Sequence, residues 1–308
     1  MAGHPLRHPS FAFRRHHHHH HHHHHPEPSP TPSPPAPTPG PQPQPQPGPT
    51  PAPQPPPGPA PAWPTFTGGV SYAGSSAEAG VAVYYDPTLG QAGLRNAIDL
   101  IADADRIVLA NESLFGDTAG VVDVLVCAIG GETDGSGGAD HSACNYQDGG
   151  AIEVCAAFGN PALVSALFEA ELSECSMNGR LCGLSTGEAL SRWCAISAVP
   201  AGTLDGFASG PAWDQAGRPD FVNRTDPTDQ NPISTGCGMV FLSWLQRTRG
   251  IGLGDIARMM VNLGDMGTLA MVYSSLTADT LPNAWVLFSQ ALAGLPKGIQ
   301  SDDPFGHK

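Results

Sequence analysis

The residues best suited to chemistry are two glutamates in the segment ALFEAELSECSM, residues 166–177. Residues 161–177 have helical apolar spacing, and both Glu171 and Glu174 fall inside the apolar arc at 3.6 residues per turn. Glu169 falls on the opposite side, which predicts an exposed residue. An ionised carboxylate is costly to bury without a partner, so the pair needs either cations or a cleft. We therefore expect Glu171 and Glu174 to be catalytic or binding residues.

A third candidate, Glu188, lies in the next predicted helix, residues 186–198. Arg192 follows it by four residues, the spacing at which oppositely charged side chains meet on a helix surface. Glu188 is therefore interpreted either as half of a structural ion pair or as a third member of the acidic site, and from spacing alone the ion pair is favoured.

The order of the predicted elements, with paired acids on one helix and GEALSRW on a later one, resembles the zincin metallopeptidases whose third zinc ligand is a glutamate. The first motif of that family reads His-Glu-x-x-His, and AELSE, residues 170–174, stands in its place here. The resemblance implies a zincin-like fold, with Glu171 as the general base and Glu188 at the third-ligand position. Ala170 and Glu174 replace both histidines, so a standard zinc site is not expected.

Two outcomes follow for the acidic site, and the sequence leaves open whether the chain is an enzyme. If a metal binds, an all-oxygen cluster with Glu174 and Glu188 as ligands suits Ca²⁺, Mg²⁺ or Mn²⁺ better than Zn²⁺, and the chain is a hydrolase with an atypical carboxylate site. If none binds, it is a pseudo-peptidase whose groove can still hold a peptide or a glycan.

Two other classes of function compete with this interpretation. One is a carboxylate-dependent glycoside hydrolase, in which two carboxyl groups flank the sugar bond; the low aromatic content of 7% argues against it. The other is a non-enzymatic exported surface or binding module, stabilised by disulfides and in one version by calcium.

Two further groups of residues could bind ligands, and we favour ordinary roles for both. Asp226 and Asp229 lie in an oxygen-rich loop before an apolar helix and could ligate calcium. Asp-Pro and Asn-Pro steps are also common turn formers, with Ser234 or Thr235 as the helix cap. His141 lies in a polar loop, residues 132–150, and we expect it to be solvated.

The seven cysteines all lie in the predicted folded part and include no Cys-x-x-Cys pair, which argues against a thiolate zinc site. Nearness in the sequence predicts disulfides between Cys144 and Cys155 and between Cys175 and Cys182, and hence an oxidising compartment. Buried reduced thiols are the alternative.

Hydrophobic patterns predict an α+β fold: an α/β layer ordered strand, helix, strand, followed by a mostly helical C-terminal half. Strands are predicted near residues 80–86, 121–129 and 151–158, with a long helix over 94–115 between the first two. Further helices are predicted near residues 161–177, 186–198, 236–249, 253–263, 267–277 and 284–293.

Composition divides the chain into a His-rich N-terminus (1–25), a proline-rich spacer (26–62) and one globular domain (63–308). The first two lack the apolar residues for a core and are predicted to be disordered; the ten consecutive histidines read as a tag or a neutral repeat. The folded part carries 27 of the 28 acidic residues, which argues against nucleic acid or anionic membrane as a partner. No transmembrane segment is expected. The spacer and disulfides favour an extracellular or cell-surface location, although no signal peptide is visible.

Overall fold

A computed structural model describes residues 58–306 except for 118–119, 121, 145–150 and 200–207. The predicted disordered N-terminus and almost all of the predicted spacer lie outside the described residues.

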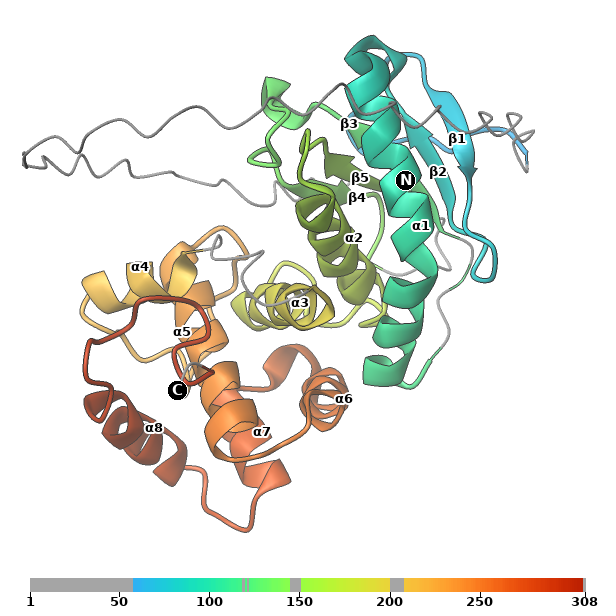
Figure 1. The fold of residues 1–308 in the computed structure, drawn as a ribbon. Coiled ribbons are helices and arrows are strands. Elements are labelled where there is room, and N and C mark those ends of the chain that lie inside the picture. The colour runs from blue at the N-terminus through green and yellow to red at the C-terminus, as the bar shows by residue number, and fades with distance from the viewer. Residues whose placement is uncertain (1–57, 118–119, 121, 145–150, 200–207, 307–308) are drawn as a thin grey trace, which may run out of the picture. The chain divides into compact units, whose positions relative to one another are not determined.

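A mixed sheet of five strands forms the N-terminal half of the described domain (Figure 1). Its central strands are parallel and its two edge pairs are antiparallel. In spatial order the strands are β1 (Ser71–Ser75), β2 (Ala82–Tyr85), β3 (Asp123–Cys127), β5 (Ala151–Cys155) and β4 (Ala139–His141). The edge strand β4 is short, and it ends at the one histidine of the described residues.

The two faces of the sheet are covered differently. Helices α1 (Gly90–Phe115) and α2 (Pro161–Cys175) pack on one face, over alternate valines and isoleucines of the strands. The other face is covered by the segment that enters the domain, through Trp63 and Phe66, together with Tyr72 of β1. Trp63 packs edge-on against Tyr84 of β2, and Tyr72 packs against the same ring at a tilt, with ring centroids 5.4 and 5.3 Å from that of Tyr84. This segment therefore belongs to the folded domain.

A buried glutamate fixes the entering segment to the sheet. Glu153 of β5 is fully buried and accepts hydrogen bonds from the Thr65 amide at 2.8 Å, the Thr65 hydroxyl at 2.6 Å and the Phe66 amide at 2.7 Å. Three donors to one carboxylate satisfy the charge without a cation.

Helix α2 is buried on all sides, because the sheet, α1 and α3 (Ser185–Ala198) all pack against it. Asn160 caps its first turn by accepting from the Leu163 amide at 3.3 Å. The prediction that Glu169 is exposed is wrong: its side chain has no accessible surface. The apolar arc drawn from the sequence therefore marked one of several buried faces.

The C-terminal half is helical and has a second core, in which Trp193, Trp213, Trp244 and Phe288 are buried. The predicted α+β architecture is confirmed, with eight α-helices in the described residues. Beyond α3 these are α4 (Ser209–Gln215), α5 (Pro232–Ser243), α6 (Leu253–Leu263), α7 (Leu269–Leu276) and α8 (Asn283–Ala293), with a π-turn at Trp244–Thr248 after α5. Strands β1 and β4 and helix α4 were not predicted.

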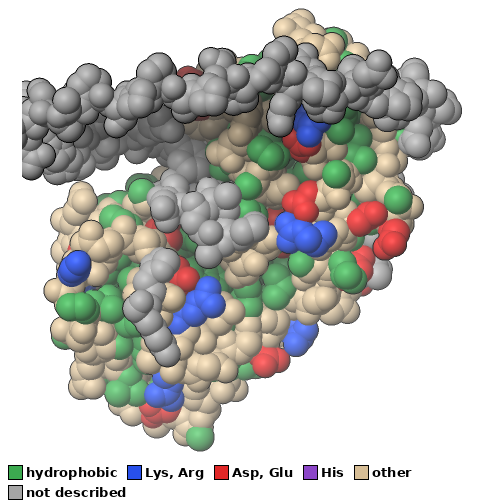
Figure 2. All heavy atoms as spheres, in the orientation of Figure 1, with side chains coloured by type: hydrophobic (Ala, Val, Ile, Leu, Met, Phe, Trp, Pro, Cys, Tyr) green, Lys and Arg blue, Asp and Glu red, His purple; other side chains and the backbone are tan. Residues whose placement is uncertain are grey.

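One face of the described domain is mixed in charge. On the face seen in Figure 2, acidic and basic side chains lie in neighbouring spots, and α1 carries the ion pairs Arg95–Asp99 at 3.1 Å and Arg106–Asp103 at 2.7 Å. In the part of the chain that the structure describes, none of the helices is long and apolar enough to span a bilayer.

Candidate functional site

The two glutamates of α2 meet at one imidazole. The Nδ1 atom of His141, on β4, lies 2.5 Å from Oε2 of Glu171 and 3.2 Å from Oε2 of Glu174. His141 is only 3% exposed, so the prediction of a solvated loop histidine is wrong. The edge strand β4 packs against α2 and places the imidazole opposite one turn of the helix. The predicted acid pair therefore shares a buried partner that the sequence did not reveal.

The third acid joins the same cluster from α3. Glu188 accepts from Arg192 Nε at 2.9 Å, which confirms the predicted ion pair, and Arg192 Nη1 donates to Ser209 Oγ at 2.7 Å. A hydrogen bond between the carboxyl groups of Glu174 and Glu188 links the two helices. Glu171, Glu174 and Glu188 are thus gathered with two cationic groups, His141 and Arg192; these five residues are called the acid–imidazole cluster below.

The charges around His141 favour its protonated form. Burial lowers the pKa of His141, but its hydrogen bond to Glu171 and the negative charge of that residue outweigh burial, and the pKa is raised overall. Burial and the charge of Glu171 also raise the pKa of the neighbouring Asp140 to about 7. The contact with Glu171 therefore favours the imidazolium form of His141.

The acids on the other side of the cluster favour protonation as well. Burial raises the pKa of Glu174 well above its ordinary value, and the charges of Glu171 and Glu188 raise it further. Burial also raises the pKa of Glu188, although Arg192 opposes this shift. We infer that Glu174 carries the proton of the bond it shares with Glu188.

The cluster is nearly closed to solvent. The side chains of Glu171 and Glu188 are 1% and 4% exposed, and only that of Glu174 has appreciable exposure, at 19%. The second oxygen of Glu171, Oε1, is buried without a hydrogen-bond partner among the described residues. A molecule arriving from solvent would therefore reach Glu174 first.

Two overlapping groups of potential metal ligands converge in the described residues, and His141 belongs to both. One is His141 with Glu171 and Glu174, and the other is His141 with Cys144 and Cys182; within each group the ligand atoms lie within 4.8 Å of one another. Two ligands held at 2.0–2.1 Å from one tetrahedral ion would stand about 3.4 Å apart. The 2.5 Å between His141 and Glu171 is shorter, so that pair is arranged as a hydrogen bond.

Asp226 and Asp229 belong to neither of these groups. Asp226 Oδ2 accepts from Asn231 Nδ2 at 3.0 Å, and Asp229 Oδ1 accepts from Gln230 Nε2 at 2.8 Å. The N-cap of α5 is Asn231, which accepts from the Ile233 amide at 3.0 Å. The loop has the turn and cap chemistry that was favoured.

The assignment of that cap to Ser234 or Thr235 is wrong, because both already lie inside the helix.

The predicted disulfide pairings are also wrong. Cys144 bonds to Cys182, with their Cα atoms 6.2 Å apart, while Cys155 and Cys175 are buried thiols. The Cys155 thiol donates to the Glu132 carbonyl at 3.2 Å, and the Cys175 thiol to the Ala143 carbonyl at 3.7 Å. Nearness in the sequence failed because β5 and α2 direct these two side chains into the core.

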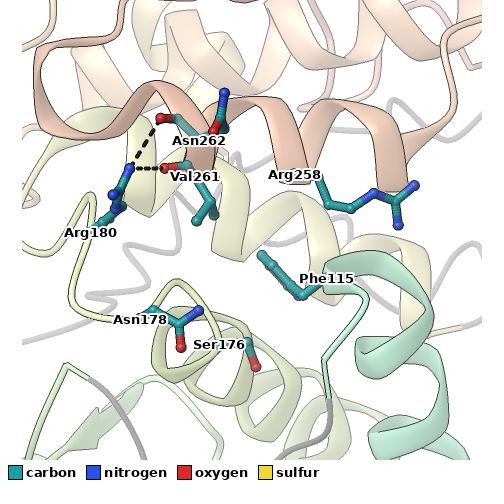
Figure 3. A pocket seen from close by; sticks show the side chains of 7 residues that line it. All are labelled: Phe115, Ser176, Asn178, Arg180, Arg258, Val261 and Asn262. Atoms are coloured by element: carbon teal, nitrogen blue, oxygen red, sulfur yellow. Dashed lines mark hydrogen bonds between the residues drawn. The ribbon is translucent and has the colours of Figure 1, made fainter.

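A separate pocket of about 500 Å³ lies where the C-terminal ends of α1 and α2 approach α6 (Figure 3). Arg180 donates from Nη1 to the carbonyls of Val261 and Asn262, each at 3.1 Å, and Arg258 donates to the Leu114 carbonyl at 3.3 Å. Both arginines thus cap helix ends, where the backbone dipole favours a cation. The pocket is lined by Phe115, Ser176, Asn178, Arg180, Arg258, Val261 and Asn262.

Comparisons with protein-family models, with curated proteins and with solved structures found no match to this chain. The chain is therefore classified by its structure alone, as an α+β domain with a mixed sheet and a buried acid–imidazole cluster.

Proposed function

We propose that this chain is a zincin-like pseudo-peptidase, a domain related to metallopeptidases in which a buried cluster of ion pairs stands in place of a metal centre. The observation that supports this most is the position of His141, whose Nδ1 atom contacts both Glu171 and Glu174. An imidazolium there, with Arg192 beside Glu188, supplies the positive charge that a metal ion would otherwise supply.

Hydrolysis by a general base at Glu171 is disfavoured by access. A catalytic base must come within hydrogen-bond reach of the water or substrate that it deprotonates. Glu171 is 1% exposed, and its Oε2 atom is already bonded to His141. Glu171 therefore serves the cluster as the counter-charge of the imidazolium.

The alternative of a glycoside hydrolase is disfavoured by the spacing of the carboxyl groups. Such enzymes hold two carboxyl groups about 5–9.5 Å apart, with the sugar bond between them. Glu174 and Glu188 instead share a hydrogen bond, which leaves no room for a sugar.

The proposed role is binding, with a peptide or a glycan as the ligand. The predicted proline-rich spacer would hold the domain away from its point of attachment, and the disulfide is compatible with an exported or surface-displayed protein. The acidic character of the folded part favours neutral or basic ligands over nucleic acid.

The test uses the full chain with His16–His25 replaced by serine, because that run would bind metal by itself. We expect no metal to be retained by the oxidised protein, no cleavage of casein or of glycan substrates, and the same melting temperature with and without EDTA. Glu171→Gln provides the decisive comparison. The proposal is overturned by a hydrolytic activity that this substitution abolishes without lowering the melting temperature.

A further inference from the structure

The disulfide lies beside the acid–imidazole cluster. Cys144 follows His141 by three residues and bonds to Cys182 in the loop between α2 and α3. A donor nitrogen of His141 and the two sulfur atoms all lie within 4.8 Å of one another. Two sulfurs and an imidazole so close together form a soft donor set, which zinc prefers among the common divalent ions.

The two loops are held together by bonds other than the disulfide. The Gly179 amide donates to the Cys144 carbonyl at 3.0 Å, and the Cys175 thiol donates to the Ala143 carbonyl at 3.7 Å. The Leu181 amide, next to Cys182, donates to Asp265 Oδ1 at 2.6 Å. Cleavage of the sulfur–sulfur bond therefore leaves both cysteines near His141.

The change in geometry that zinc would need is small. With zinc–sulfur bonds of about 2.3 Å and a tetrahedral angle, two thiolates on one ion stand about 3.8 Å apart. Rotation of the two side chains can supply that separation, because the Cα atoms are already 6.2 Å apart.

We propose that the reduced protein binds one zinc ion through His141, Cys144 and Cys182. A dithiol reductant breaks the sulfur–sulfur bond, supplies two electrons and two protons to give two thiols, and becomes a disulfide itself. Zinc then displaces the proton of each thiol and the extra proton of the imidazolium, and these protons pass to solvent. The fourth position of the ion remains for water or a nearby carboxylate.

This site goes beyond the proposed pseudo-peptidase function and is compatible with it. Zinc would replace the imidazolium as the positive charge facing Glu171 and Glu174, so the carboxylates keep a counter-ion in either state. A search of the sequence for Cys-x-x-Cys misses the site, because its local part reads His141-x-x-Cys144 and its third ligand is Cys182, thirty-eight residues after Cys144.

The experiment uses the full chain with His16–His25 replaced by serine, in an oxidised and in a reduced form. Reduction is carried out without oxygen by a water-soluble phosphine, which reacts with the disulfide and water to give two thiols and phosphine oxide. Zinc per chain is measured after removal of unbound metal. Added Co²⁺ is followed by the near-ultraviolet charge-transfer band of thiolate ligands. Cys144→Ser with Cys182→Ser removes two ligands, and Cys237→Ser, at a buried cysteine of α5, is the matched control.

We expect one zinc per reduced chain and none in the oxidised chain. The double serine variant should bind zinc about 100-fold or more weakly than the reduced protein, while Cys237→Ser binds it normally. Without any substitution, zinc should protect Cys144 and Cys182 of the reduced protein from alkylation, as mapped by mass spectrometry. The proposal is overturned if the reduced chain takes up no zinc, if the cobalt band is absent, or if both cysteines are alkylated equally fast with and without zinc.

Discussion

The contact between His141 and Glu171 makes the sharpest prediction about stability. Replacing His141 by Asn removes the imidazolium and leaves a 1%-exposed carboxylate without its cation. Breaking a buried pair from one side typically costs about 3–5 kcal/mol. A buried glutamate can limit this loss by taking up a proton, which costs about 1.4 kcal/mol for each pH unit above the ordinary glutamate pKa of about 4.3.

The expected loss of unfolding free energy at pH 7 is therefore about 3–4 kcal/mol. Urea unfolding followed by tryptophan fluorescence can measure it, because Trp193, Trp213 and Trp244 are buried in the second core. With a urea dependence of about 3 kcal/mol per molar, the midpoint should fall by about 1 M. Glu171→Gln combined with His141→Asn should recover at least about 2 kcal/mol of the summed single losses, because the pair is coupled.

An exposed ion pair provides the control for this measurement. Arg95, whose side chain is 73% exposed, pairs with Asp99 at 3.1 Å, and Arg95→Ala should cost less than about 1 kcal/mol. A loss of unfolding free energy below about 1 kcal/mol for His141→Asn, or a coupling energy below about 0.5 kcal/mol, would refute the role of His141 as the counter-ion of Glu171.

Three further variants test two buried glutamates and the disulfide. Burial raises the pKa of Glu169 well above its ordinary value, although the charge of Arg106 opposes this shift. The native state therefore binds more protons than the unfolded state. The free energy of unfolding should consequently fall as the pH rises above about 4.5. Thermal melting at pH 5 and pH 8 should show a smaller fall for Glu169→Gln, and equal falls would contradict this. Glu153→Ala should cost about 2–4 kcal/mol and open the chain near Thr65 to protease, whereas an unchanged digestion pattern would argue against the anchor. The double variant Cys144→Ser with Cys182→Ser lacks the disulfide that closes a 38-residue loop. Its unfolding free energy in metal-free buffer should be lower by up to about 4 kcal/mol. A change below about 1 kcal/mol would count against a structural role of the disulfide.

Part of the helical half could be predicted, namely where a helix has one apolar face and clear ends. Residues 253–263 were predicted as a helix, and α6 has those bounds. Helix α2 was located correctly but its faces were not, since it is surrounded by protein and its apolar residues mark no single side. Periodicity carries information about orientation only where one side of an element faces water.

The acids of the site could be predicted, but their partner could not. Glu171 and Glu174 stood out because charged residues interrupt an apolar segment. His141 lies thirty residues earlier, at the end of a three-residue edge strand with no apolar pattern. The contact of His141 with the two glutamates, like that between Cys144 and Cys182, arises from the pairing of β4 with β5 and the packing of α2. Neither the strand pairing nor the helix packing can be predicted from the local sequence.

The anchoring of Thr65 and Phe66 to Glu153 has a mechanical consequence. Tension applied through the N-terminal segment would load three hydrogen bonds to a single side chain before it reached β1, the edge strand that follows in the chain and pairs with β2. Those three hydrogen bonds would break first. The residues before β1 would then detach and lengthen the N-terminal segment under load, while the sheet and the helical half stayed folded.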